Sequence, residues 1–201
     1  MIYFKKCGYS DTDNKVSHRK VLRAEAYRLL RRALLNKNIP EEDQELDYNE
    51  YGKPFLKNNC GWHFNISHCR KLAACAIAQS PIGVDVERIR QFPELVLKRC
   101  FTERETELIK ESNNSDLTFF QLWTLKEAYV KAIGRGLSYP LRDAEFIIDN
   151  NHITANTEGG FSFAQIIIDN EFVCSVCCNN IFNNQIIQRS FAEDLPLDLL
   201  K

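Results

Sequence analysis

Apolar residues recur at helical spacing in two long segments of the chain. In residues 17–36 they lie three and four positions apart, the spacing of a helix that packs one stripe against a core. The second segment follows the polar residues 113–116 and ends at Gly134, a residue type that commonly terminates helices. Alternating or short continuous apolar runs predict strands at residues 2–4, 46–48, 63–67, 72–79, 82–88, 144–149, 152–155, 161–168 and 172–178.

The order of these elements repeats along the chain. Each half has a long helix followed by strands, and the apolar run 72–78 is similar to the run 172–178. Between the halves, Thr102 and Glu105 have the spacing of a capping box, which predicts a further helix running to about Glu111. The mixture predicts an α+β fold and suggests an internal duplication.

The second long helix carries the first candidate for chemistry. Trp123, Glu127 and Lys131 are four residues apart, so they form one stripe with Lys126 beside it. A carboxylate and an ammonium therefore lie one turn apart on the same face. The structural alternative is an amphipathic helix with a surface ion pair.

Two acids on a predicted strand form the second candidate. Alternation puts Asp85 and Glu87 on one face of residues 82–88, with Val84 and Val86 on the other. Together with Glu127 they would supply three carboxylates, which are oxygen ligands of the kind that Mg²⁺ prefers. The alternative is the solvent face of a half-buried strand.

Four motifs together resemble those of a known family. They are Gly83 to Glu87, Trp123 to Lys131 with Gly134-Arg135-Gly136-Leu137 after it, Gly52-Lys53-Pro54, and Asn65-Ile66-Ser67-His68. In this order and spacing they are similar to the 4′-phosphopantetheinyl transferases of the long, surfactin-synthetase-activating type. The resemblance implies two similar α/β halves forming a pseudo-dimer, residues 1–90 and 91–201, with the active site in the cleft between them.

The resemblance also implies an activity. The family transfers 4′-phosphopantetheine from coenzyme A to a serine of an apo acyl or peptidyl carrier protein and releases 3′,5′-ADP. The metal would be Mg²⁺, for which Mn²⁺ can substitute, and its ligands would be Asp85, Glu87 and Glu127. Catalysis would fall to Glu127 and Lys131. The coenzyme A-binding residues would be Arg19, Lys53, Pro54, Ser67, His68, Asp85 and Lys131.

Several alternatives stay open at this point. Arg23 and Arg28 compete with Arg19 as the residue that holds the 3′-phosphate, and a metal-bound water competes with Glu127 as the base for the serine proton. A Mg²⁺-dependent hydrolase of a nucleotide pyrophosphate would use the same acids, and a non-catalytic module would bind coenzyme A alone. Nor does the sequence identify which carrier protein is served.

The composition bears on the partners, the location and the cysteine chemistry of the protein. The 201 residues are 44% hydrophobic and 26% charged with a net charge of −1, which gives no reason to expect a nucleic-acid partner. Without an 18-residue apolar run or a signal-peptide pattern, we expect a soluble, cytoplasmic protein that has no membrane partner. The double-length format of the resembling family implies a monomer. The eight cysteines read as reduced thiols, with Cys174 and Cys177 on opposite faces of a strand and Cys69 beside the proposed site. Arg135 is a plausible contact for an acidic carrier protein.

Overall fold

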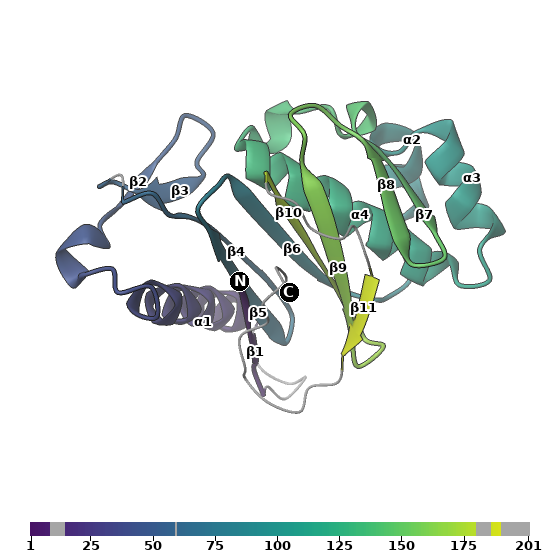
Figure 1. Ribbon diagram of the computed structural model, residues 1–201. Helices are drawn as coiled ribbons and strands as arrows, with labels where there is room; N and C mark the ends of the chain where they lie inside the picture. The colour runs from purple at the N-terminus through teal and green to yellow at the C-terminus, as the bar shows by residue number, and fades with distance from the viewer. Residues whose placement is uncertain (9–14, 59, 180–185, 190–201) are drawn as a thin grey trace.

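Two sheets lie at the centre of the molecule, and each carries a long helix on its outer face (Figure 1). The computed structural model describes residues 1–8, 15–58, 60–179 and 186–189. The first sheet has the order β1-β5-β4, and the second has the order β11-β9-β10-β6, in which all pairings are antiparallel except that of β11 with β9. The predicted α+β class is confirmed. The strands of these sheets are β1 (Ile2–Lys6), β4 (His63–Cys69), β5 (Leu72–Ala78), β6 (Ile82–Arg88), β9 (Ser162–Ile168), β10 (Phe172–Cys178) and β11 (Ile186–Arg189).

Helix α1 (Lys15–Leu35) covers the first sheet. Its predicted apolar stripe is buried, and part of it packs on Tyr3, Phe64 and Cys75 of the strands beneath. The buried stripe consists of Leu22, Ala26, Leu29, Leu30 and Ala33. The arginine side chains of the helix are exposed.

Helix α4 (Ser115–Ile133) covers the second sheet. The side chain of Asn114 accepts a hydrogen bond from the Leu117 N–H at its start, and Gly134 ends it in the left-handed conformation with φ 74°. Phe119 and Phe120 of the helix pack in the same core as Phe163, which lies on β9. The sequence pattern therefore located both ends of this helix correctly.

Helix α4 approaches the backbone of β6 very closely at Gly83. A Cβ atom at this position would lie 1.9 Å from the Ala128 carbonyl oxygen and 2.5 Å from the Ala132 nitrogen. Only a residue without a side chain fits there. The close approach fixes how far the helix stands from the strand that bears Asp85.

A third apolar core lies between the two sheets. Ala74 and Ala76 of the first sheet share it with Val84, Val86 and residues from β9 and β10 of the second. At the seam, Asn65 Oδ1 of β4 accepts the Val84 N–H at 2.8 Å, where β6 forms the edge of its own sheet. This side-chain bond satisfies a backbone donor that an edge strand would otherwise leave unpaired.

Shorter elements complete the fold. The hairpin β2-β3 lies beside the first sheet, and the hairpin β7-β8 packs with α3 on the outer side of α4 (Figure 1). The capping box of α3 is confirmed, because Thr102 and Glu105 exchange both side-chain bonds. The remaining elements are β2 (Leu46–Tyr48), β3 (Pro54–Leu56), β7 (Glu145–Asp149), β8 (His152–Asn156), α2 (Leu97–Cys100), α3 (Glu103–Glu111) and 3₁₀ turns at Glu41–Asp43, Glu94–Val96, Gly136–Ser138 and Leu141–Asp143.

Two features bear on organisation and surroundings. Strand β6 pairs with β10 and so belongs to the second sheet, while the division into residues 1–90 and 91–201 stays a prediction.

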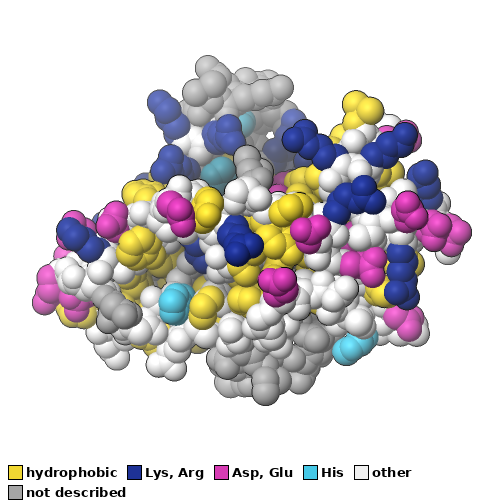
Figure 2. Space-filling view, turned by 90° about the horizontal axis from the view of Figure 1, so that it is seen from above, with side chains coloured by type: hydrophobic (Ala, Val, Ile, Leu, Met, Phe, Trp, Pro, Cys, Tyr) yellow, Lys and Arg dark blue, Asp and Glu magenta, His cyan; other side chains and the backbone are white. Residues whose placement is uncertain are grey.

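Figure 2 shows acidic and basic side chains interspersed with hydrophobic ones over the face seen from above. Among the described helices, none has the length and apolar character needed to cross a membrane.

Candidate active site

Asp85 lies in the middle of β6, and it is only 5% exposed. Strand alternation sends Val84 and Val86 into the core between the sheets, so Asp85 faces the other way, toward α4. Its neighbour across the ladder is Ser175 of β10. A carboxylate buried in this position needs polar partners to be stable.

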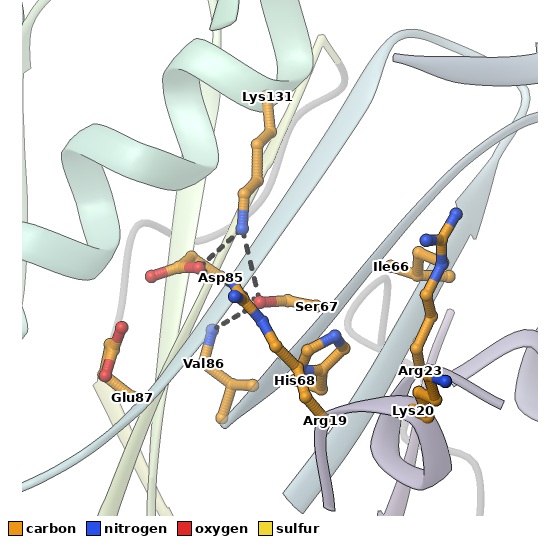
Figure 3. Close-up of a pocket in the computed structure, with 10 residues that line it drawn as sticks. All are labelled: Arg19, Lys20, Arg23, Ile66, Ser67, His68, Asp85, Val86, Glu87 and Lys131. Atoms are coloured by element: carbon orange, nitrogen blue, oxygen red, sulfur yellow. Dashed lines mark hydrogen bonds and ion pairs between the residues drawn. The ribbon is translucent and has the colours of Figure 1, made fainter. Parts of the chain in front are cut away.

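Two elements, α4 and β4, supply those partners. Lys131 Nζ of α4 donates to Asp85 Oδ1 at 2.6 Å, and Ser67 Oγ of β4 donates to the same oxygen at 3.0 Å. Ser67 Oγ in turn accepts from Lys131 Nζ at 3.2 Å and from the Val86 N–H at 3.3 Å (Figure 3). Burial has the largest single effect and lowers the pKa of Lys131, but the charge and hydrogen bond of Asp85, together with the charges of Glu127 and Glu87, leave that pKa raised. Lys131 is therefore a stable ammonium at neutral pH.

Two more carboxylates lie close to Asp85. Burial raises the pKa of Glu87 and of Glu127, and the charge of Asp85 raises both further. Glu87 Oε2 also accepts a hydrogen bond from Arg90 Nη1 at 2.9 Å, which acts in the opposite direction. The charge of Asp85 still disfavours the ionised forms of Glu87 and Glu127, so the cluster has too little positive charge to balance its carboxylates.

The chemistry of these donors fits Mg²⁺. Carboxylate oxygens are its preferred ligands, and Asp85 Oδ2 is buried with no hydrogen-bond partner in the described part of the chain. The geometry is less complete, because within residues 1–8, 15–58, 60–179 and 186–189 no three His, Cys, Asp or Glu side chains converge as a metal site requires. Glu87 is turned toward Arg90 instead. The ligand set Asp85, Glu87 and Glu127 stays a prediction.

A cavity of about 910 Å³ opens beside this group of residues. It is of the size that small-molecule and cofactor sites occupy. Helix α1 approaches it with three basic side chains, while the carboxylates and Lys131 lie across from them (Figure 3). The lining residues are Arg19, Lys20, Arg23, Ile66, Ser67, His68, Asp85, Val86, Glu87 and Lys131.

His68 lies on β4 within the cavity and is half-buried. Its pKa is lowered, first by burial and then by the positive charges of Lys131 and Arg19. At neutral pH the imidazole is therefore uncharged. A neutral imidazole serves an anion by donating an N–H hydrogen bond rather than by adding a full positive charge.

The structure gathers most of the sequence-predicted residues around the cavity. Arg19, Ser67, His68, Asp85, Glu87 and Lys131 all line it. Lys53, Pro54 and Glu127 are not among the lining residues: Lys53 Nζ donates to the carbonyl oxygens of Ile82 and Ala132, each at 3.1 Å, and Pro54 begins β3. The roles of all nine residues stay predictions.

The open choice among the arginines becomes narrower. Arg28 is ion-paired with Glu25 on the same helix and does not line the cavity. Arg19 and Arg23 both do, and each is exposed. The geometry therefore leaves these two as candidates for an anion contact.

The sequence assigned no role to three residues that the structure does place. Lys20 lines the cavity beside Arg19, and Asn65 holds the edge of β6. The alternation of β4, which puts Asn65 and Ser67 on one face, was a usable signal for Asn65. Lys126 turns away from the cavity and is fully buried against Glu105 at 2.8 Å, which no local pattern indicates.

Comparison with known proteins finds similarity to one superfamily. Residues 81–177 match the model of the 4′-phosphopantetheinyl transferase superfamily. The 4′-phosphopantetheinyl transferase gsp of Aneurinibacillus migulanus is 42% identical over 116 residues, which are 57% of this chain and 47% of the relative. The 4′-phosphopantetheinyl transferase Sfp of Bacillus subtilis (strain 168) is 35% identical over 105 residues, 51% of this chain and 47% of the relative.

Residues 81–177 therefore resemble the 4′-phosphopantetheinyl transferase superfamily. The relatives gsp and Sfp are 4′-phosphopantetheinyl transferases, which confirms the resemblance that the four motifs indicated. The chain spans about half the length of these two curated relatives. Among solved structures, the holo-[acyl-carrier-protein] synthase of Thermotoga maritima aligns with a TM-score of 0.43 and 24% identity, covering 51% of this chain and 65% of that one.

Proposed function

We propose that this chain transfers 4′-phosphopantetheine from coenzyme A to a serine of an apo acyl or peptidyl carrier protein and releases 3′,5′-ADP. One observation carries the proposal. Lys131, Asp85 and Ser67 form a hydrogen-bonded group in the wall of a cavity whose opposite side is basic. A substrate with a separate phosphate and a diphosphate that binds Mg²⁺, such as coenzyme A, suits a cavity with basic residues on one side and carboxylates with Lys131 on the other.

The residues around the cavity divide the binding of coenzyme A between them. Arg19 on α1 would hold the 3′-phosphate, with Arg23 as its close neighbour in the lining. Lys131, His68 and Ser67 would bind the diphosphate, with Lys131 supplying full charge and His68 supplying an N–H donor. Pro54, at the start of β3 and outside the cavity lining, would lie on the adenine side, as the resemblance implies.

The transfer step needs a base and a group that stabilises the leaving phosphate. The serine Oγ of the carrier attacks the β-phosphorus, a new O–P bond forms, and the bond from that phosphorus to 3′,5′-ADP breaks. Glu127 accepts the serine proton, directly or through a water, and its raised pKa makes it a better base than an ordinary glutamate. Lys131 stabilises the negative charge that develops on the departing 3′,5′-ADP.

The proposed metal completes the charge balance. Mg²⁺ bound by Asp85, Glu87 and Glu127 would neutralise diphosphate charge and polarise the attacked phosphorus. For Glu87 this requires that its ion pair with Arg90 opens, since the same carboxylate is otherwise engaged. Lys131 and Asp85 remain paired at the wall of the cavity and hold it in shape.

The setting of the reaction is part of the proposal. We infer a cytoplasmic monomer that acts on carrier proteins of fatty-acid, polyketide or peptide-synthetase systems, without nucleic-acid or membrane partners. Arg135 is exposed just beyond the end of α4 and would meet an acidic carrier surface.

The experiment is mass spectrometry of an apo acyl and an apo peptidyl carrier protein after incubation with the chain, coenzyme A and Mg²⁺. We expect a gain of one phosphopantetheine group, and none when EDTA replaces Mg²⁺. Free 3′,5′-ADP without a mass gain would instead identify a hydrolase of the pyrophosphate. Binding of coenzyme A without either product would leave only a binding module.

A matched pair of variants links the activity to the site. Glu127→Gln removes the base and one proposed ligand, so the transfer rate should fall about 10²-fold or more. Glu107→Gln makes the same chemical change on the exposed surface of α3 and should leave the rate unaltered. Equal rates in the two variants would refute the assignment of Glu127.

A further inference from the structure

The C-terminal end of α4 is held by side chains from a distant part of the chain. The last carbonyl groups of a helix have no partner within it and need donors from elsewhere. Asn49 Nδ2 donates to the Gly134 carbonyl oxygen at 2.9 Å, and Lys53 Nζ donates to the Ala132 carbonyl oxygen at 3.1 Å. Both donors come from the turn between β2 and β3, here called the 49–53 turn.

The 49–53 turn is organised to present these two donors. Asn49 Oδ1 accepts the N–H groups of Tyr51 at 3.0 Å and of Lys53 at 2.8 Å. The Asn49 N–H donates to the Lys53 carbonyl oxygen at 3.0 Å. One asparagine thus closes the turn with its oxygen and leaves its amide nitrogen for the helix.

The helix end is shaped to receive the turn. Gly134 has φ 74°, and a Cβ atom there would lie 3.1 Å from Asn49 Nδ2 and 3.4 Å from Lys53 Cδ. A side chain at this position would push the turn away. The left-handed glycine therefore serves both to end α4 and to admit its external partners.

Lys53 has a second bond that ties the helix to the strand beside it. Its Nζ donates to the Ile82 carbonyl oxygen at 3.1 Å, at the first residue of β6. The ammonium therefore bridges the start of β6 and the end of α4. Lys131 precedes Ala132 by one residue and Asp85 follows Ile82 by three, so the bridge adjoins both partners of the 2.6 Å ion pair in the cavity.

These contacts leave the ammonium little to offer a ligand. Two of its three N–H groups are directed at backbone carbonyls, and Lys53 is not among the residues that line the 910 Å³ cavity. A positive charge at the C-terminus of a helix is also favourable in itself, because the helix dipole is negative there.

We propose that Asn49 and Lys53 form an external C-cap of α4, and that Lys53 is a positioning residue which sets Lys131 against Asp85 instead of contacting coenzyme A. The proposal rests on the proposed transferase function for its effect on rate. Its structural part, the fixing of the helix end, does not depend on that function.

The structural part is tested by hydrogen exchange of the free chain, without coenzyme A. Lys53→Met keeps the aliphatic length and removes the ammonium, while Asn49→Ala removes the other donor. In both variants the amides of the last turn of α4 should exchange about 10-fold faster, the effect of losing one strong hydrogen bond. Lys57→Met is the control, because Lys57 lies just after the same hairpin and pairs only with the exposed Glu45 in the described part of the chain. Unchanged exchange at the helix end in both variants would overturn the proposal.

The kinetic part separates positioning from binding. For a positioning residue, Lys53→Met and Asn49→Ala should each lower kcat for carrier modification about 10-fold and leave KM for coenzyme A nearly unchanged. An increased KM with an unchanged kcat in Lys53→Met would make Lys53 a ligand of coenzyme A and refute the positioning role. If Lys53→Met fails to fold, Asn49→Ala still decides, since it leaves the lysine in place.

The two proposals fail in different ways. Absence of carrier modification by the unaltered chain would refute the transferase, yet the exchange rates at the end of α4 would still confirm or refute the cap. Normal modification with no protection of the helix end by Asn49 and Lys53 would refute the cap alone.

Discussion

Gly83→Ala should push helix α4 away from strand β6 without removing any polar group from the site. The added methyl would stand 1.9 Å from the Ala128 carbonyl oxygen, far inside the 3.0 Å that real side-chain contacts respect. Because both obstructing atoms belong to the backbone of α4, no side chain can rotate out of the way. Helix and strand must therefore move apart by about 1 Å.

That displacement has consequences for stability and for rate. Forcing a methyl into a packed contact typically costs about 1–3 kcal/mol in the free energy of unfolding. The ion pair between Lys131 and Asp85 spans the same contact at 2.6 Å, so it would lengthen with the separation. A misplacement of about 1 Å between catalytic groups can lower a rate about 10²-fold.

Two assays check this prediction. Urea unfolding followed by circular dichroism gives the stability, and mass spectrometry of the modified carrier gives the rate. Gly8→Ala is the control, because its added methyl meets nothing within 4 Å. If Gly83→Ala unfolded at the same urea concentration as the parent and modified the carrier at the same rate, the contact would not set the helix position and our reasoning would be wrong.

Three further changes have predictable results. Glu105→Ala would leave the fully buried Lys126 ammonium without its carboxylate, so urea unfolding should show a loss of about 3–5 kcal/mol. His68→Ala should raise KM for coenzyme A with little effect on kcat, and steady-state kinetics with an unchanged KM would remove His68 from the site. Burial lowers the pKa of Lys53 to about 8 in the folded chain, so the unfolded chain binds more protons between pH 8 and its ordinary value of 10.5. Over that window the parent should gain about 3 kcal/mol of stability relative to Lys53→Met, as urea unfolding at a series of pH values would show.

Local sequence patterns predicted these helices and strands well, because the spacing of apolar residues within an element shows which of its faces is buried. Residues 17–36 were predicted as a helix and Lys15–Leu35 form one, while the strands Ile82–Arg88 and Phe172–Cys178 have the predicted bounds. Cys174 and Cys177 face different cores, as alternation requires. In each case the side chains inside the element determine which face is buried.

The sequence was less informative where an element depends on a distant partner. No strand was predicted at residues 54–56, yet they pair with β2 as the strand β3. Strand β11 lies where no pattern was recognised, because it is defined by its parallel pairing with β9.

The candidate site shows the same division. Four motifs were enough to select most of the residues that line the cavity, since each motif carries its charged or polar groups at a fixed spacing. They did not indicate that Lys53 bonds to Ile82 and Ala132, nor that Lys126 is buried with Glu105. Lysine serves equally well as a phosphate ligand, a helix cap or a buried ion-pair partner, and only the packing around it decides among these roles.

The first sheet and its hairpin hold both of the elements that carry the carboxylate and the ammonium. Asn65 and Ser67 of β4 accept the N–H groups of β6 on either side of Asp85, and the 49–53 turn fixes the end of α4 just beyond Lys131. The Lys131–Asp85 pair therefore lies between two sets of contacts that residues 49–67 supply. Because β6 and α4 also meet at Gly83 without an intervening side chain, a shift of either one changes the pair directly. The geometry of the candidate site thus depends on residues 49–67 as well as on residues 81–177, which the superfamily model matches.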